Sequence, residues 1–346
     1  MPLEINNDAC KDGEMLSSIK FHEIDGRFVI GKSMKLSELR PLPPVVICEN
    51  NFPLMDLVDS INKTDVPPAC VLERSNNVGK VGSGKVEIDY VPVVVNEEGI
   101  KGILSGPNVL QNRKIVILSQ GLQAEWNCIS NQWIQEILHG YGICTLSYDY
   151  SGDVGIEKRS YDLVKNFEYL KRWGYKVGGY GSSYGGLALL LASSQLCDTG
   201  SNFEVIANRT IIPKLNDTLV KDLRGKTGNS AIDLKYIQCN IGQVVSQLNE
   251  GGLRVTEREL SAVCEGQYNL DKVVDKIICP HLNVQGSFDE KVDIYAVNQV
   301  MKQISKQNHD NYMVEISGAN HGCEHLDHYK IQLYLLASFL IEKMRG

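Results

Sequence analysis

The sequence lacks the features that mark membrane, secreted and nucleic-acid-binding proteins. It has no apolar run of the roughly twenty residues that a membrane-spanning helix needs, and residues 1–8 are polar and acidic. We therefore expect no transmembrane segment and no cleavable signal peptide. The formal net charge is -7, and a polyanion binder needs clustered lysine and arginine to neutralise phosphates. Nucleic acid and anionic membrane surfaces are therefore poor candidate partners.

The spacing of the cysteines also gives no indication that they pair. The 10 cysteines include no C-x-x-C pair, and several of them fall inside apolar segments. Reduced, buried thiols explain this pattern most simply, and they predict a cytoplasmic protein. Export by a machinery that needs no leader peptide is the alternative. The sequence leads us to assign no cofactor and no metal.

The composition is that of a globular protein. With 346 residues, 43% hydrophobic and 22% charged, the chain can form one large α/β domain with insertions or two modest domains. We expect residues 1–85 to be an N-terminal extension packed on the core, with a short amphipathic helix at 53–62. Residues 79–85 match the phosphate-loop pattern G-x-x-x-x-G-K, but Val86 follows where Ser or Thr should hold the metal. Residues 86–95 alternate and are β-branched, so we reject the phosphate loop. We predict instead a glycine turn that leads into a hairpin of 86–95 and 100–104, closed by a turn at 96–99.

Strand and helix patterns alternate from residue 114 onward. This alternation predicts a mostly parallel central sheet with helices on both faces, and ligands that bind beyond the carboxyl ends of the strands. The predicted strands are at 115–119, 142–148, 175–180, 203–212, 276–284 and 312–317. The predicted helices are at 126–139, 160–173, 186–193, 294–307 and 326–344.

Residues 213–272 interrupt the alternation. They are mixed polar and helical, are punctuated by glycines, and contain no apolar strand. An insertion of this length over the carboxyl end of the sheet would form a helical cap or lid. We expect it to select the substrate.

Residues 181–185 match G-x-S-x-G with Ser183 at the centre. Between a strand and a buried helix, this motif is typical of a nucleophile elbow, in which a sharp turn forces the serine into a strained backbone conformation. Gly181 and Gly185 fit because a Cβ at either position would strike the neighbouring strand or helix. Two other interpretations are a glycine-bearing β-turn and a loose dinucleotide fingerprint that begins at Gly179.

A carboxylate and a histidine follow at later strand ends. Asp289 comes just after the strand at 276–284, and His321 lies in the loop after the last strand. Serine, acid and base thus occur in the order Ser, Asp, His at one edge of the sheet. Asp217 is a rival for the acid, whereas Glu290 and Asp293 are better explained as carboxylates at a helix N-terminus. Residues 321–325 also match H-x-x-E-H, a zinc-protease pattern, although the glycine at 322 argues against the helix that it requires.

From about residue 86 to the end, the chain resembles the α/β-hydrolase fold superfamily. The residues that carry the resemblance are Ser-Gln-Gly-Leu at 119–122, Asp149 after the next strand, the elbow, Gly-Ser-Phe-Asp at 286–289 and Asn-His-Gly at 320–322. The resemblance implies a triad of Ser183, Asp289 and His321, with the backbone N–H groups of Tyr184 and Leu122 as the oxyanion hole. Gln120 is a departure, because many members carry histidine before that glycine.

The resemblance implies a serine hydrolase with residues 86–346 as its domain. We expect it to cleave an ester or thioester of a small-molecule or lipid-like acyl substrate through an acyl-enzyme. A serine peptidase or an acyltransferase would use the same residues. The alternative from a different class is a non-catalytic binding protein of this fold.

Overall fold

The computed structural model describes residues 20–24, 27–31, 75–81, 84–94, 101–109, 111–122, 124, 128–148, 150, 153–251, 253–308, 310–323 and 325–345. The helix predicted at 53–62, the turn predicted at 96–99 and Asp149 lie outside these residues.

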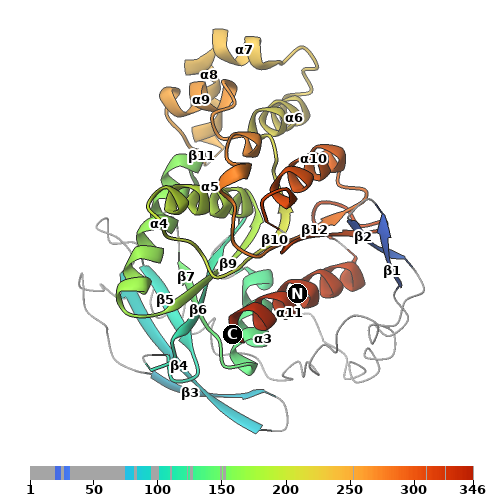
Figure 1. Ribbon diagram of the computed structural model, residues 1–346. Coiled ribbons are helices and arrows are strands. Elements are labelled where there is room, and N and C mark those ends of the chain that lie inside the picture. Colours follow the sequence, from blue (N-terminus) through green and yellow to red (C-terminus); the bar gives the residue numbers. More distant parts are fainter. Residues whose placement is uncertain are drawn as a thin grey trace.

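One large sheet organises the described residues. Its eleven strands have the order β1-β2-β13-β12-β10-β9-β6-β7-β5-β4-β3 (Figure 1). The seven neighbouring strands from β2 to β7 pair in parallel, and the remaining pairings are antiparallel. The strands are β1 Lys20–Ile24, β2 Arg27–Gly31, β3 Ser75–Val81, β4 Gly84–Val94, β5 Lys101–Gly106, β6 Lys114–Ser119, β7 Cys144–Tyr148, β9 Lys176–Ser183, β10 Ile206–Ile211, β12 His281–Gly286 and β13 Asn311–Ile316. The sheet is therefore mostly parallel, as the alternation predicted.

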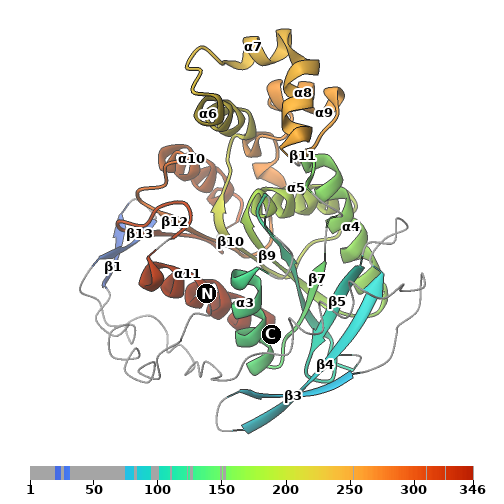
Figure 2. The same ribbon diagram turned by 180° about the vertical axis from the view of Figure 1, so that it is seen from behind.

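Helices cover both faces of this sheet (Figures 1 and 2). On one face, α4 (Ile156–Arg172), α5 (Tyr184–Asp198) and α10 (Ile294–Ser305) enclose a core that includes Phe167 and Leu190. On the other face, α3 (Ile129–Gly140) and α11 (Leu326–Arg345) cover a second core around Val116 and Leu336. Strand β6 between them is almost continuously apolar because both of its faces are buried.

Several boundaries differ from those predicted; α4 begins at Ile156 instead of 160, and α5 extends to Asp198 instead of 193. The strand expected at 276–284 begins only at His281, after a 3₁₀ turn at Val274–Lys276. Pro280 has no N–H to donate to a ladder, so the apolar residues before it cannot pair as a strand. The strand expected at 203–212 is shorter, at Ile206–Ile211.

The described parts of the N-terminal segment are strands at both edges of the sheet. β1 and β2 form a hairpin beside β13, whereas β3 and β4 form a hairpin at the opposite edge. The two strands of the hairpin predicted at 86–95 and 100–104 are confirmed, because β4 and β5 pair in antiparallel fashion, and the residues from Gly84 onward form a strand and not a helix.

Residues 213–272, which we call the inserted segment, form a helical layer at one end of the molecule (Figure 1). Its helices surround a small cluster of their own that includes Ile237 and Leu260. The elements are α6 Leu215–Thr227, α7 Leu234–Cys239, α8 Ile241–Glu250, β11 Leu253–Arg254, α9 Glu257–Cys264 and a 3₁₀ turn at Leu270–Lys272. The predicted helical character of this insertion is confirmed.

The two ends of the inserted segment are bonded to each other. The N–H of Leu270 donates to the carbonyl of Pro213 at 2.9 Å, and the N–H of Leu215 donates to the side-chain oxygen of Asn269 at 3.0 Å. A third attachment lies beside α4, where β11 pairs in parallel with β8 (Asp153–Val154). The segment thus leaves and re-enters the core at one place.

In the part of the chain that the structure describes, we find no helix that combines the length and apolar character required to cross a bilayer.

Candidate active site

Ser183 stands at the junction of β9 and α5 with a backbone conformation that L-residues rarely adopt. Its φ is 51° and its ψ is -115°, which confirms the strained turn predicted from G-x-S-x-G. The glycines make this turn possible. A Cβ on Gly181 would lie 2.5 Å from the Cα of Gly186, and one on Gly185 would lie 2.1 Å from the carbonyl oxygen of Ser119. No residue larger than glycine fits either position without movement of the backbone.

His321 and Asp289 lie next to Ser183 in a continuous chain of contacts. The Nε2 atom of His321 is 3.1 Å from the Oγ atom of Ser183, and its Nδ1 atom is 2.9 and 3.0 Å from the two carboxylate oxygens of Asp289. The histidine follows β13, the aspartate follows β12 and the serine ends β9, so strand ends at one edge of the sheet supply the three groups, with β10 between β12 and β9. We call these strand ends the nucleophile edge. With the proton on Nδ1, Nε2 can accept the serine proton.

The carboxylate of Asp289 is held rigidly. Its side chain is 0% exposed, and it accepts the backbone N–H groups of Lys291 and Val292 at 3.0 and 2.9 Å. The side-chain amide of Gln285 donates to its other oxygen at 2.6 Å. These donors fix the direction in which the carboxylate meets the imidazole of His321.

The other acidic residues considered from the sequence lie elsewhere. Asp217 is exposed in the first turn of α6, and the carboxylate that contacts His321 is that of Asp289. Asp293 caps α10 by accepting the N–H of Tyr295 at 2.9 Å, as expected of a helix N-terminal carboxylate. Glu290 was wrongly expected to act in the same way. It accepts the backbone N–H of His321 at 3.2 Å and so braces the histidine loop.

The two residues expected to supply oxyanion donors lie beside the serine. Tyr184 is the first residue of α5, at the positive end of the helix dipole. Leu122 follows the turn after β6, and the preceding Gly121 is so close to the elbow that a Cβ on it would lie 3.8 Å from the Cβ of Ser183. Both residues line the cavity described below.

Arg159 is a feature of this site that the sequence did not indicate. It lies on α4 and is only 1% exposed, and its Nη1 atom donates to the carbonyl oxygens of Gln120 and Gly121 at 2.9 and 3.5 Å. The guanidinium also lies over the rings of Tyr150 and Tyr184, at 4.4 and 5.0 Å from their centroids. One buried cation thus contacts both the turn before Leu122 and the residue after the serine.

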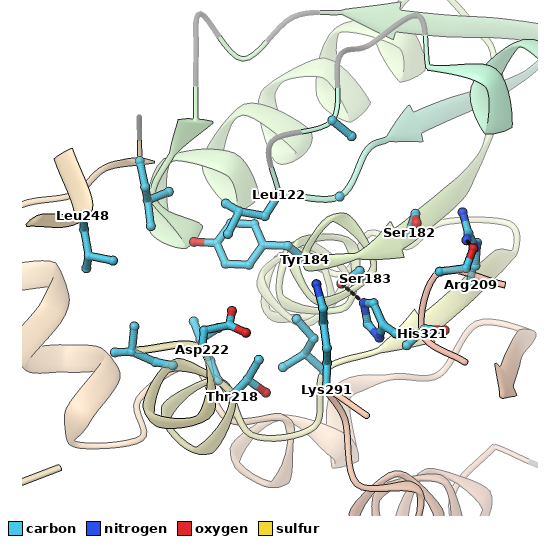
Figure 3. Close-up of a pocket in the computed structure, with 18 of the residues that line it drawn as sticks. Leu122, Ser182, Ser183, Tyr184, Arg209, Thr218, Asp222, Leu248, Lys291 and His321 are labelled. Atoms are coloured by element: carbon cyan, nitrogen blue, oxygen red, sulfur yellow. Dashed lines mark hydrogen bonds between the residues drawn. The ribbon is translucent and has the colours of Figure 1, made fainter. Parts of the chain in front are cut away.

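A cavity of about 510 Å³ lies between the nucleophile edge and the inserted segment (Figure 3). Ser183 and His321 line it from the sheet, and leucines of α6, α8 and α9 line it from the inserted segment. Most of its wall is apolar, as expected for a small-molecule site that orients its ligand with a few polar groups. The apolar residues are Leu122, Ile212, Leu215, Leu219, Leu248, Leu253, Val255, Leu260 and Val263.

Two other histidines are buried in the core and differ from His321. His139 contacts the hydroxyl groups of Ser105 and Thr145, and burial lowers its pKa to about 3. His281 lies on β12 between the side chains of Asn208 and Asn311, and burial lowers its pKa to about 4. Both imidazoles are therefore neutral at neutral pH, with hydroxyl or amide partners.

The zinc-protease pattern at 321–325 receives no support from the geometry. His321 is engaged by Ser183 and Asp289, while the ring of His325 lies 5.2 Å from that of His328. The glutamate at 324 is outside the described residues. Among the residues that are described, no group of three or more His, Cys, Asp or Glu side chains could hold a metal ion.

No protein-family model and no curated protein sequence matches the chain. Solved structures do resemble it. An esterase from Pyrococcus furiosus superposes with a TM-score of 0.54 at 16% identity, over 87% of this chain and 97% of the esterase. Est1E from Butyrivibrio proteoclasticus with bound ferulic acid gives 0.54 at 18%, over 74% and 99%. Carboxyl esterase 2 from the mycorrhizal fungus Tuber melanosporum gives 0.52 at 12%, over 81% and 89%. At such identities the likeness is one of fold.

Proposed function

We propose, on the premise that this chain has the α/β-hydrolase fold, that it is a serine hydrolase of esters or thioesters. The observation that carries the proposal is the unbroken contact from Ser183 through His321 to Asp289, at 3.1 and 2.9 Å, on a strained strand-to-helix turn. A serine is a weak nucleophile unless a neighbouring base takes its proton, and this arrangement supplies that base. The esterase names of the structural neighbours agree with the proposal.

In this mechanism, the Oγ atom of Ser183 attacks the carbonyl carbon of the substrate while Nε2 of His321 takes the hydroxyl proton. The tetrahedral intermediate collapses, the bond to the leaving group breaks, and His321 gives the proton to the departing alcohol or thiol. Water then attacks the acyl-enzyme with His321 again as base, which releases the acid and restores the serine. Asp289 holds the imidazole and stabilises its protonated form.

The backbone N–H groups of Leu122 and Tyr184 would stabilise the negative oxygen of the intermediate. Such a donor lowers the barrier by about 3–4 kcal/mol in other serine hydrolases. We assign Arg159 the role of positioning this oxyanion hole, because it holds the carbonyls of Gln120 and Gly121 and lies over the ring of Tyr184. A turn whose carbonyls are fixed cannot rotate its N–H groups away from the serine.

The inserted segment would act as the cap that selects the substrate. Its helices provide the apolar wall of the cavity opposite Ser183, so an acyl or aryl group can be buried there. On this proposal residues 86–346 form the hydrolase domain, with 213–272 as its cap and 1–85 as an extension.

Labelling with a fluorophosphonate tests the proposal. We expect modification of Ser183 in the wild-type protein and none in Ser183→Ala. Ser182→Ala is the matched control, because Ser182 is adjacent and lines the same cavity; it should still be labelled. Labelling of folded Ser183→Ala, or no labelling of folded wild type, would contradict the enzyme and favour a binding protein. Ester and amide substrates, with and without an alcohol acceptor, then separate an esterase from a peptidase and an acyltransferase.

A further inference from the structure

The charged side chains of the cavity are not evenly distributed. Beside the serine and histidine, the charged residues that line it are Arg209 and Lys291, and both are cations. On the side of the inserted segment they are Asp222, Lys226 and Glu259. Figure 3 shows Arg209 on one side of the Ser183–His321 pair, and Lys291, followed by Asp222 and Leu248, on the other. The two cations therefore flank the nucleophile, and the apolar part of the cavity lies farther from it, beyond Lys291.

Arg209 is fixed in place without a carboxylate partner. It lies on β10, its guanidinium is 4.9 Å from the ring centroid of Tyr329, and its Nη2 atom donates to the carbonyl of Gly322. Arg209 lines the cavity, and no ion pair joins it to a carboxylate among the described residues. A half-buried guanidinium of this kind has donors to spare for a planar anion.

Lys291 supplies a second positive charge from the loop that carries the acid. Lys291 is two residues after Asp289, and its backbone N–H donates to the carboxylate of that aspartate. This hydrogen bond fixes the position of the Lys291 backbone. Its side chain points toward Ser183 (Figure 3). Within the described part of the chain, its ammonium has no carboxylate within 4 Å. The ammonium is therefore available to a ligand in the cavity.

The acidic residues of the cavity do not neutralise these two cations. Glu259 accepts the backbone N–H of Glu157 at 3.1 Å and so belongs to the start of α4. Asp222 and Lys226 are one helical turn apart on α6, and their charges offset each other locally. The apolar leucines lie on this same side, which leaves the surroundings of Ser183, flanked by Lys291 and Arg209, as the place for a charged group.

We propose that the substrate is an ester with two unlike arms, one apolar and one anionic. The apolar arm would lie under the inserted segment, and a carboxylate or phosphate on the other arm would meet Lys291 and Arg209. The proposal rests on the hydrolase function above and narrows its substrate class. It places the scissile carbonyl at Ser183, within a few bonds of the anionic group.

Matched pairs of esters test this inference. One pair carries the charge in the acyl half, mono(para-nitrophenyl) glutarate against para-nitrophenyl pentanoate. A second carries it in the leaving group, the butyrate ester of para-hydroxybenzoate against that of para-hydroxybenzamide. A third replaces carboxylate by phosphate, butyryl glycerol phosphate against butyryl glycerol. We expect kcat/KM to favour the anionic member of at least one pair by about tenfold, and salt to reduce that preference.

Variants of Lys291 assign the preference to the cations beside the nucleophile. Lys291→Met should lower the ratio of anionic to neutral kcat/KM about tenfold, and Lys291→Glu should invert it. Lys226→Met removes the same charge from α6 in the inserted segment and should preserve the ratio. Arg209 is a less clean probe, because it also holds the carbonyl beside His321.

Three results would overturn the inference in distinguishable ways. A preference for the neutral member of every pair, or an unchanged ratio in Lys291→Met, would refute the anionic arm and leave the hydrolase intact. Absence of both ester turnover and Ser183 labelling would refute the hydrolase and this inference together.

Discussion

The nucleophile edge and the inserted segment face one cavity, but they are built in opposite ways. At the edge, glycines admit no Cβ, Ser183 is strained and the carboxylate of Asp289 is 0% exposed. The inserted segment packs around a small cluster, and α6 buries only Leu215 and Leu223. The contrast suggests that the geometry of the reaction is fixed by the sheet, whereas the part that contacts the remainder of the substrate is less constrained.

The largest difference should appear between two aspartates, one in each region. Asp289→Asn should reduce kcat about ten-thousandfold, the effect of this change in comparable triads, because an amide no longer stabilises the protonated imidazole. Asp217→Asn on α6 should change it less than threefold, which steady-state kinetics on one ester can measure. Comparable losses of kcat in both variants would make Asp217 a candidate for the catalytic acid again.

The same glycine substitution should then have opposite effects in the two regions. Gly185→Ala places a methyl group 2.1 Å from the carbonyl of Ser119, so the backbone must shift. We expect the free energy of unfolding to fall by about 1–3 kcal/mol and fluorophosphonate labelling to be lost. Denaturant unfolding and labelling of the folded variant check this. A stable, fully labelled Gly185→Ala would show that the elbow is not tightly packed.

Acid should weaken the sheet through its buried histidines. The pKa of His281 is about 4 in the folded chain and about 6.5 when unfolded, so only the unfolded state binds its proton between these values. Its contribution to stability is thus complete above pH 6.5 and is lost as pH falls toward 4, by about 3 kcal/mol. Denaturant unfolding at pH 7 and pH 4.5 measures the loss, and His281→Gln should show a smaller one. An equal loss in the variant would assign it to other groups.

Arg159 offers a test on α4, the helix that touches both regions. Arg159→Met should lower kcat about tenfold or more with little change in KM, because the oxyanion turn loses its fixed carbonyls. The affinity of a boronic acid, which mimics the tetrahedral intermediate, should fall in step, and Arg159→Lys should restore part of both. A rise in KM alone would point to substrate binding rather than positioning of the oxyanion hole.

We expect the smallest effect on stability and activity from a substitution in the inserted segment. Gly225 is helical, without positive φ, and a Cβ there would meet nothing within 4 Å. Gly225→Ala should raise the stability of α6 by about 0.5–1 kcal/mol through helix propensity and leave kcat unchanged. Hydrogen exchange of the α6 amides measures the first effect. Destabilisation would show that this helix is more tightly packed than its surroundings indicate.

Much of the sheet could be predicted from the sequence, and the predicted α/β-hydrolase resemblance is confirmed at the level of fold. Continuous apolar runs such as residues 115–119 mark strands buried on both faces. Ser183, Asp289 and His321 could be found because each lies at or just after the end of a predicted strand. The structure places these three residues in contact. Their roles as a triad remain a proposal.

Other features of the structure could not be predicted from the residue pattern of the sequence. The strand limit at His281 depends on one proline, and the separate helices of the inserted segment are short and only partly apolar. Arg159 could not be found because its partners are backbone carbonyls 38 and 39 residues earlier, which any residue type can provide. Such contacts depend on three-dimensional packing rather than on residue pattern.

The bonds that join the two ends of the inserted segment also bear on how this architecture can be modified. The hydrogen bond between Pro213 and Leu270 holds the two ends of the inserted segment close together. The distance that a chain must bridge at this point of the core would therefore stay short whatever segment lies between the two residues. Segments of other lengths could be exchanged here without a change in strand order, as domain insertion generally requires. The junction is thus a natural graft point, at which an engineered or evolving relative could acquire a new specificity as a single cassette.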